Sequence, residues 1–422
     1  MMIDRDQWHE IGVVLGRNKL RTFLTAFGVF WGILMLVIMM GSGKGLQNGA
    51  AAGFGTSVTN SMFIWTQQTS MPYKGFRRGR NFNMHNDDVE AVRASVPELD
   101  ILSPRCQAGG YRGSDNITRG TKTGAFNIYG DYPEYVEIEP MDIMEGRFIN
   151  QRDIEEKRKV CFIGREVYNT LYEPGEEVMG SYIRAQGVNY KVVGMYKSKV
   201  DDPNRAEEQE KSIIIPLTTF QQTYNWGDIV GWLAVTAKPD VPVSVVGEKI
   251  KSLVKQRRSV HPDDERAFGS FNKEEAFGRM MGLLTGINIL SLIVGTLTLL
   301  AGAIGVSNIM LVIVKERTKE FGVRRAIGAP PSSIIKQVVL ESVTLTVGAG
   351  ILGIIAGVWL LELVSAGMNA AATQGGFFRN PGVELPIVLT AFLILMVSGI
   401  LAGIVPARKA VEVKPVEALR YE

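Results

Sequence analysis

The chain has 422 residues, with 46 lysines and arginines against 43 aspartates and glutamates, which gives a net charge of +3. This near balance excludes an ordinary nucleic-acid-binding protein, which needs a strongly basic face. Hydrophobic residues make up 46% and charged residues 21% of the sequence. Soluble domains carry about a quarter charged residues, which is more than this chain has. The composition also excludes a disordered, collagen-like or coiled-coil chain. The apolar residues must therefore be concentrated in particular segments.

Four apolar segments contain no Asp, Glu, Lys or Arg. They are residues 22–43, 280–314, 342–361 and 385–407. About 20 apolar residues cross a hydrocarbon core roughly 30 Å thick, so each segment predicts a transmembrane helix. The second segment is longer than one crossing needs, and we expect its helix to project from the membrane at its N-terminal end.

Lysines and arginines near these segments predict the orientation. They are Arg5, Arg17, Lys19 and Arg21 before the first segment, Lys315, Arg317, Lys319, Arg324, Arg325 and Lys336 between the second and third, and Arg408, Lys409, Lys414 and Arg420 after the fourth. The loop 365–384 carries only Arg379. Because cytoplasmic loops are rich in Lys and Arg, both termini and the 315–336 loop should face the cytoplasm, with the large segment 46–279 on the far side.

The large extracytoplasmic segment is predicted to be a mixed α/β domain. Its expected elements at the two ends are strands at 62–66, from 101 onward, 231–236 and 267–271, and helices at 87–96, with Asn86 as cap, and 243–257. This β-α-β order occurs twice and predicts an outer unit of about 46–119 and 225–279. The middle, about 120–224, is predicted to be an insertion. Its expected strands are 125–129, 159–163, 190–194 and 212–216, and the charged run 199–211 is expected to be an exposed loop.

The two cysteines, Cys106 and Cys161, both lie in this domain. A disulfide between them is possible in an oxidising compartment, but their spacing does not show that they meet. Cys161 lies in an apolar strand, where a buried free thiol is common.

No residue pattern predicts catalysis. His9, His85 and His261 are isolated, and neither HExxH nor CxxC occurs. The run Gly41–Gly45 contains a lysine between glycines, but a phosphate-binding loop needs Ser or Thr where Gly45 stands. We expect this run to be a flexible exit from the first helix. Glu341 follows Lys336 by about one helical turn and is expected to pair with it.

The loop after the second membrane segment has an unusual arrangement. Charged residues at 315–317, 319–320 and 324–325 are accompanied by the apolar Phe321 and Ile327, and Gly328 is expected to end the helix. A polar linker does not need these apolar residues. The pattern predicts a short amphipathic helix that docks into a groove of a partner.

Here the sequence resembles the MacB/FtsX-type permeases of ABC transporters. Their corresponding loop carries E-R-T-x-E-[IF]-G-x-x-R-A-x-G-A, which Glu316 to Ala329 matches. Supporting matches are Pro406 to Ala410, Lys414 to Arg420, and Asn18 to Thr25 entering the first helix. The middle of the extracytoplasmic domain is similar only in general layout.

The resemblance implies a membrane α-helical fold of four transmembrane helices with a large α+β extracytoplasmic domain, acting by mechanotransmission. The outer unit would be similar to the Porter subdomain, the insertion to the Sabre subdomain, and the first two helices would extend into a stalk. The loop would couple the chain to a separate ATPase through Glu316, Arg317, Glu320, Phe321, Gly322, Arg325, Ala326 and Gly328.

MacB itself has a nucleotide-binding domain fused before its first helix, where this chain has residues 1–21. The resemblance therefore implies a non-catalytic chain without a cofactor of its own, with ATP and Mg on an ATPase partner in trans. It also implies a homo- or heterodimer in lipid of the bacterial inner membrane, a periplasmic adaptor and an outer-membrane duct. Export from the periplasm is the leading function, and an FtsX-like regulator of a cell-wall hydrolase or a lipoprotein-release permease are the alternatives.

These predictions together give the expected order of segments along the chain. It is a cytoplasmic segment 1–21, a membrane helix 22–45, a periplasmic domain 46–279, a membrane helix with stalk 280–314, a coupling loop 315–336, a membrane helix 337–364, a periplasmic loop 365–384, a membrane helix 385–407 and a cytoplasmic tail 408–422.

Overall fold

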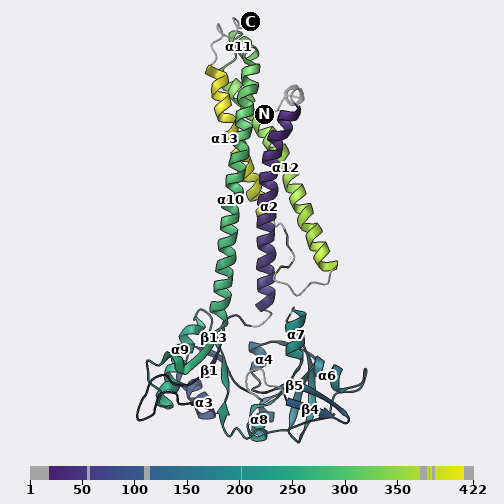
Figure 1. The fold of residues 1–422 in the computed structure, drawn as a ribbon, viewed down its shortest axis with the longest axis vertical. Coiled ribbons are helices and arrows are strands. Elements are labelled where there is room, and N and C mark those ends of the chain that lie inside the picture. The colour runs from purple at the N-terminus through teal and green to yellow at the C-terminus, as the bar shows by residue number, and fades with distance from the viewer. Residues whose placement is uncertain are drawn as a thin grey trace. The chain divides into compact units, whose positions relative to one another are not determined.

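The computed structural model describes residues 19–54, 58–108, 115–200, 202–370, 378–379, 381–382 and 385–412. The chain divides into two compact units, Met1–Ala50 with Gly282–Glu422, and Ala51–Met281 (Figure 1). The expected segment before residue 19, with His9, and the motif Lys414 to Arg420 lie outside the described residues.

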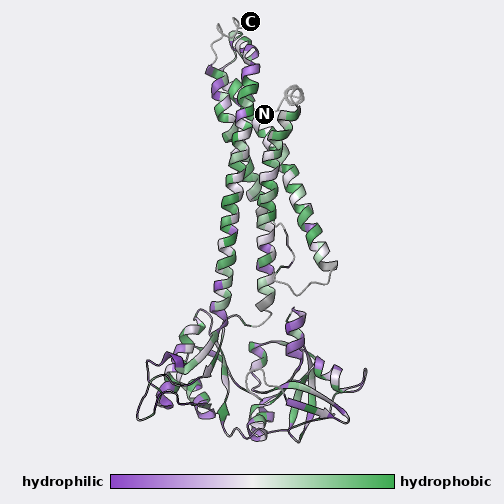
Figure 2. Cartoon of the chain, viewed as in Figure 1, coloured by the Kyte–Doolittle hydropathy of each residue, from purple (hydrophilic) through white to green (hydrophobic). Residues whose placement is uncertain are grey.

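The first unit is made of long helices. They are α2 (Lys19–Phe54), α10 (Lys273–Glu316), which begins in the second unit, α11 (Thr318–Ala326), α12 (Pro331–Ala370) and α13 (Leu385–Glu412). Among the described residues, 4 helices are long and apolar enough to cross a membrane, which confirms the prediction. Figure 2 shows the apolar residues spread along them. At 1.5 Å per residue, α10 is about 66 Å long, roughly twice the hydrocarbon thickness.

The α2 helix continues to Phe54, so the flexible exit expected at Gly41–Gly45 is wrong. These glycines lie against neighbouring side chains. A Cβ on Gly41 would stand 2.4 Å from Leu361 Cδ1, and one on Gly43 would stand 1.8 Å from Asn288 Oδ1. Small residues allow membrane helices to approach closely, and this packing outweighs the low helix propensity of glycine.

The α2 and α10 helices also pack closely through glycines nearer the N-terminus of α2. A Cβ on Gly302 of α10 would lie 3.3 Å from the backbone of Gly28 in α2. Around this contact, Ile33 and Leu36 of α2 are buried in one core with Leu299 of α10. One face of α10 is thus covered by its own chain.

The second unit contains an outer antiparallel sheet in the order β3-β12-β1-β13. Its strands are β1 (Ser61–Thr66), β3 (Leu99–Gln107), β12 (Trp232–Ala237) and β13 (Phe268–Asn272), and its helices are α3 (Asn86–Ser95) and α9 (Val243–Arg257). Both predicted β-α-β patterns are confirmed. The N-cap of α3 is His85, however, and Asn86 is the first helical residue.

Six strands of the insertion close into a ring in the order β5-β10-β7-β9-β8-β4 and back to β5. They are β4 (Asp115–Arg119), β5 (Lys122–Asp131), β7 (Val160–Gly164), β8 (Tyr182–Ala185), β9 (Val188–Ser198) and β10 (Ser212–Pro216). The parallel pairing of β10 with β5, with Ile213 opposite Ile128, completes it. The ring is therefore a small barrel, and its first strand begins before the predicted boundary at 120.

Shorter elements surround the two sheets. They are β2 (Met84–His85), α4 (Tyr135–Ile138), β6 (Met141–Gly146), α5 (Gln151–Glu155), α6 (Arg165–Leu171), α7 (Pro203–Glu210), α8 (Leu217–Thr223), β11 (Ile229–Val230) and the 3-10 turn η1 (Glu265–Ala267). The α7 helix lies where an exposed loop was predicted. Asp202 caps it through hydrogen bonds from Asn204 N and Arg205 N, and Pro203 begins it, which are standard helix starts.

Two strands of the barrel, β7 and β10, are buried on both faces. Cys161 and Ile213 belong to the core inside the barrel, whereas Phe162 and Ile214 point the other way, into a core that also contains Ala234 of the outer sheet. Successive side chains of a strand point to opposite faces, so one apolar run fills two cores. This second core packs the barrel against the outer sheet.

The β3 strand belongs to both sheets. Its residues from Leu99 to Arg105 pair with β12, and Cys106 and Gln107 pair with β5. In the sheet order, β5 and β10 stand between Cys106 in β3 and Cys161 in β7, so the two cysteines do not lie on adjacent strands. A disulfide needs Cα atoms within about 7 Å. Both cysteines are free and buried, so the disulfide left open by the sequence does not form.

Candidate functional site

The candidate site is the segment from Glu316 to Ala329, whose predicted short helix is α11. Thr318 starts the helix and donates its hydroxyl to Lys315 O at 2.8 Å. At the other end Gly328 has φ +102°, and Gly328 N and Ala329 N donate to Arg325 O and Arg324 O at 3.1 and 3.0 Å. This is a Schellman ending, which glycine adopts without strain, and α12 follows at Pro331.

Arg317 lies between α10 and α11 and joins two carboxylates. Its Nε and Nη2 donate to the two oxygens of Glu320 at 2.8 and 2.9 Å, and its Nη1 donates to Glu341 Oε1 at 2.8 Å. The Arg317 side chain is 11% exposed and that of Glu341 only 4%. The expected pairing of Glu341 with Lys336 is therefore wrong, because Lys336 is exposed while Glu341 points into the helical unit.

Further contacts fix α11 against α12 and α13. Arg324 donates to Gln337 of α12 at 2.9 Å and pairs with Glu320 at 2.8 Å. Arg325 Nη1 donates to Val411 O of α13 at 2.5 Å. Phe321 is 1% exposed, with the Arg317 guanidinium 5.1 Å from its ring centroid. We call Arg317, Glu320, Arg324 and Glu341 the Arg317 cluster.

The other side of α11 is open and partly apolar. Ile327 is 82% exposed and Val323 is 39% exposed. Of the residues predicted from the sequence, Glu316, Ala326 and Gly328 share this exposure, whereas Phe321 and Gly322 are buried.

The predicted residues thus divide into an inner set that fixes α11 and an outer set that is exposed. The site residues predicted from the sequence do not include Val323, Arg324, Val411 or Glu341, for which Lys336 was the expected partner. An uncharged membrane segment bordered by a glutamate was the only signal for Glu341.

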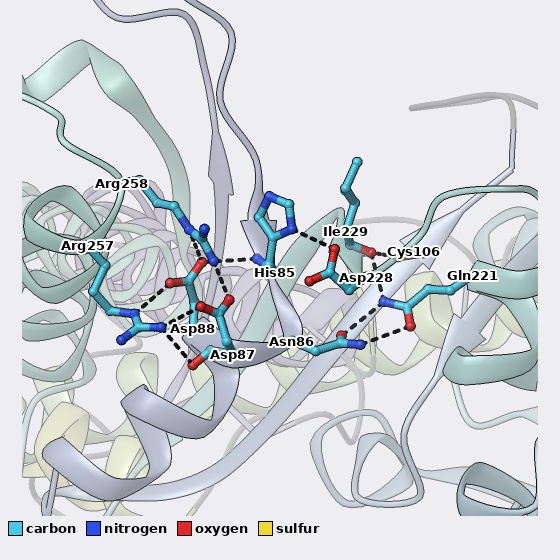
Figure 3. A network of polar contacts seen from close by, with 10 residues as sticks. All are labelled: His85, Asn86, Asp87, Asp88, Cys106, Gln221, Asp228, Ile229, Arg257 and Arg258. Carbon is cyan, nitrogen blue, oxygen red and sulfur yellow. Dashed lines mark hydrogen bonds and ion pairs between the residues drawn. The ribbon is translucent and has the colours of Figure 1, made fainter.

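A second polar network connects the outer sheet to the barrel (Figure 3). Arg257 and Arg258 at the end of α9 donate to the Asp88 carboxylate at 2.8 and 2.6 Å, and His85 N donates to the same carboxylate at 3.0 Å. On the barrel side, Asn86 and Gln221 exchange two hydrogen bonds of 3.1 and 2.9 Å.

The same network includes a histidine pair. His85 Nδ1 lies 2.8 Å from Asp228 Oδ1, and this hydrogen bond lowers the pKa of Asp228. Because the network joins α3, α8, α9 and β11, it restrains movement between the outer sheet and the barrel.

A buried arginine lies where β3 passes between the sheets. The Arg105 guanidinium stands 3.9 Å from the Tyr129 ring centroid and 4.0 Å from that of Tyr135, and its Nε lies 2.7 Å from Asp131 Oδ1. Stacking on two rings suits a planar guanidinium. Burial raises the pKa of Asp131, and the charge of Arg105 opposes this effect.

Within the described ranges, no group of three or more His, Cys, Asp or Glu residues could hold a metal ion. The candidate site itself has an apolar exposed face, and the Arg317–Glu341 ion pair is buried.

Comparison with known families gives two matches. Residues 22–253 match the family described as MacB-like periplasmic core domain, and residues 292–415 match the FtsX-like permease C-terminal family. Together they include most of the chain, from the first membrane helix to the end of α13.

Two curated relatives match over nearly the whole chain. The macrolide export ATP-binding/permease protein MacB of Bdellovibrio bacteriovorus is 26% identical over 98% of this chain and 61% of its own length. The pyoverdine export ATP-binding/permease protein PvdT of Pseudomonas entomophila is 27% identical over 97% of this chain and 58% of its own length. The chain thus spans about 60% of the length of these relatives.

Two solved structures resemble part of the chain. The periplasmic region of MacB from Actinobacillus actinomycetemcomitans is 17% identical, with a TM-score of 0.42, and covers 53% of this chain and 94% of its own. The extracellular domain of YknZ from Gram-positive bacteria is 12% identical, with a TM-score of 0.41, and covers 50% of this chain and 100% of its own. On the family matches, this chain is a membrane protein with an extracytoplasmic domain, and it belongs to the MacB/FtsX-type permeases of ABC transporters.

Proposed function

We propose that this chain is the permease subunit of a bacterial ABC exporter, in which an ATPase partner drives a conformational change of the extracytoplasmic domain. The relatives named for macrolide and pyoverdine export favour export over the regulatory and lipoprotein-release alternatives. The observation that carries the proposal is the two-sided α11, with Val323 and Ile327 exposed while the Arg317–Glu341 pair that fixes the helix is buried. An exposed apolar helix face supported by a fixed base suits docking into a groove of the ATPase.

A displacement of α11 would be transmitted to two long helices, α10 and α12. Arg317 holds α11 to Glu341 of α12 and directly follows Glu316, the last residue of α10. At its other end, α10 begins at Lys273, immediately after the last residue of β13 in the outer sheet. A continuous helix therefore connects the docking segment to the extracytoplasmic domain, and mechanical coupling requires no channel through the chain.

A dimer is supported by an apolar stripe on α10. Exposed residues recur at spacings of four and three, the repeat of a coiled coil, on the side of α10 away from α2. This α10 seam consists of Leu283, Ile287, Leu290, Val294, Leu297, Ala301, Ile304 and Asn308. Leu283, Leu290 and Leu297 are 69%, 60% and 60% exposed, so the described chain does not cover the stripe. A second copy of this chain would bring an identical stripe and fits it best.

Asn308 adds a polar position to the seam. It is exposed, lies in the uncharged part of α10, and its side chain makes no hydrogen bond within the described residues. A polar group facing lipid is costly, whereas two such amides can hydrogen-bond across a helix pair. A single Asn in a coiled-coil seam also sets the register, which favours a homodimer in a defined alignment.

The remaining parts of the proposal follow from the family. The chain would lie in the inner membrane with α11 and both termini in the cytoplasm and the domain of residues 51–281 in the periplasm. ATP and Mg would bind to the ATPase partner, and this chain would carry no catalytic group. A periplasmic adaptor and an outer-membrane duct would complete the export path.

The test is the pair of substitutions Val323→Asp and Ile327→Asp on the exposed face of α11. The full chain is isolated from native membranes, and both the amount of ATPase that accompanies it and the stimulation of ATP hydrolysis are measured. We expect both to fall at least about tenfold, as for central residues of an interface. The matched control is Ile143→Asp with Met144→Asp, also exposed but in β6. Unchanged ATPase recovery in the α11 variant rejects the proposal.

A further inference from the structure

A basic hairpin projects from the outer unit between β1 and β2. At its tip, Tyr73 and Phe76 exchange two backbone hydrogen bonds of 3.1 and 2.9 Å. Lys74 and Gly75 between them have φ of 44° and 86°. Two consecutive positive φ angles define the two-residue turn that best matches strand twist. We call residues 69–80 the basic hairpin.

The base of the basic hairpin is fixed by a buried carboxylate. Asp264, which is 0% exposed, accepts hydrogen bonds from Ser70 N and Ser70 Oγ at 2.7 Å and from Met71 N at 3.0 Å. The two sides are joined by Gly79 N donating to Thr69 O at 2.6 Å and by Thr69 N donating to Arg80 O at 3.0 Å. The hairpin therefore presents its tip in a defined shape.

Arg80 stabilises the tip of the basic hairpin through hydrogen bonds and a contact with the Phe76 ring. Its Nη2 donates to Arg258 O at 2.7 Å and to Ser259 O at 3.0 Å, which fixes the guanidinium. The guanidinium carbon lies 4.0 Å from the centroid of the Phe76 ring. Phe76 is thus held in place on one face while 46% of it remains exposed.

The charges of the tip are not compensated. Lys74, Arg77 and Arg78 are exposed and form no ion pair with any described residue. No acidic residue occurs in residues 67–86. Beside these cations, Met71 is 40% exposed. The surface thus combines positive charge with exposed apolar groups, and Arg, Met and aromatic residues are the types enriched in protein interfaces.

We propose that the basic hairpin is a docking surface for an acidic segment of a partner protein. Charge complementarity selects an acidic partner, and Phe76 and Met71 need apolar contacts that a polyanionic polysaccharide lacks. A membrane surface fits less well, because the Arg80 guanidinium covers one face of the Phe76 ring and only 46% of the residue is exposed. The inference goes beyond the proposed function and involves none of the residues of α11.

The test uses the full chain in phosphatidylcholine nanodiscs and a short fluorescein-labelled peptide of glutamates interspersed with leucines as the probe. Binding is followed by fluorescence anisotropy at low and physiological salt. The variant Arg77→Glu with Arg78→Glu reverses two tip charges. Its matched control, Arg184→Glu with Lys197→Glu, makes the same charge change at exposed, unpaired cations of β8 and β9. A third variant, Phe76→Ser, keeps every charge.

We expect the tip charge reversal to weaken peptide binding at least about tenfold, and the control to change it less than about twofold. Phe76→Ser should weaken binding severalfold at both salt concentrations. No binding to the unmodified chain, or equal losses in the tip and control variants, overturns the proposal. Stronger Arg77-dependent binding to phosphatidylglycerol vesicles or to heparin than to the peptide also overturns it, since it assigns the hairpin to a membrane or a polysaccharide.

Discussion

Arg317 and Glu341 are joined by a hydrogen bond of 2.8 Å between Nη1 and Oε1, although α11 separates them in the chain. Both side chains are almost completely buried. The bond connects the end of α10 to α12 and places Phe321 beneath the guanidinium. Two carboxylates around one guanidinium supply paired donors and acceptors, which offsets the cost of burying the charges.

We predict that Glu341→Ala destabilises the helical unit. Removing one partner of a buried ion pair costs about 3–5 kcal/mol, and the remaining bonds of Arg317 to Glu320 should reduce this to about 2 kcal/mol. The midpoint of thermal unfolding in nanodiscs should fall by several degrees. Glu362→Ala, at an exposed carboxylate of the same helix, should leave it unchanged. Equal midpoints for the two variants would contradict the role assigned to Glu341.

Position 290 on the α10 seam should crosslink two copies of the chain. Leu290→Cys places a thiol on the seam, and oxidation in native membranes should give a disulfide-linked homodimer on a non-reducing gel. Ile289→Cys is the control, since Ile289 is 53% exposed but lies off the seam. Cys106 and Cys161 are buried and should contribute no background. Crosslinking at 289 but not at 290 would exclude this seam as the dimer contact.

Arg105→Lys should destabilise the extracytoplasmic domain by about 2 kcal/mol, because an ammonium cannot stack on two rings as a guanidinium does. Tryptophan fluorescence of the full chain during urea unfolding measures the change, since Trp232 lies beside Arg105, with 5.8 Å between its ring centroid and the guanidinium. Arg184→Lys on the barrel surface should have no effect. A loss below about 0.5 kcal/mol for Arg105→Lys would argue against a structural role for the stacked guanidinium.

Asp264 should make the order of the basic hairpin dependent on pH. Burial tends to raise its pKa, but hydrogen bonds from Ser70 and Met71 bring the pKa below its ordinary value of 3.8. A lowered pKa in the folded state means that the carboxylate stabilises the fold above pH 3.8 and that this contribution is lost as the pH falls further.

The measurement is hydrogen exchange of residues 69–80 in the unmodified chain and in Asp264→Asn. The variant should exchange faster at neutral pH, and the difference should shrink well below pH 3.8. Asp263→Asn is the matched control, because that side chain is 85% exposed. A pH-independent difference would mean that the ionised form of Asp264 is not what holds the hairpin.

The membrane helices could be predicted because the absence of charge is a local property of the sequence. The ends of these helices could not. The α2 helix continues past Lys44 since Gly41 and Gly43 fit against Leu361 and Asn288, and those contacts depend on residues far along the chain. Asp202 and Pro203 form a recognisable start signal for the α7 helix. The high charge of the segment nevertheless led to the prediction of a loop.

The candidate site was predictable in position but not in its internal contacts. The charged and apolar pattern of 315–329 located α11, and Gly328 marked its end. The partner of Glu341 could not be predicted from the sequence. Lys336 is near in sequence but faces outward on α12, whereas Arg317 is brought to Glu341 by the turn between α10 and α11. Tertiary geometry, rather than sequence spacing, selects the pair.

The closed ring of strands determines the order in which the extracytoplasmic domain can fold during synthesis. All strands of the ring lie between Asp115 and Pro216, so the barrel can close before β12 and β13 have emerged. The outer sheet cannot, because β1 pairs only with β12 and β13, which come later in the chain. Pairing of distant segments is slow and leaves unpaired edges exposed in the meantime. The finished barrel, which holds β3 through Cys106 and Gln107, is therefore the template on which the outer sheet is completed.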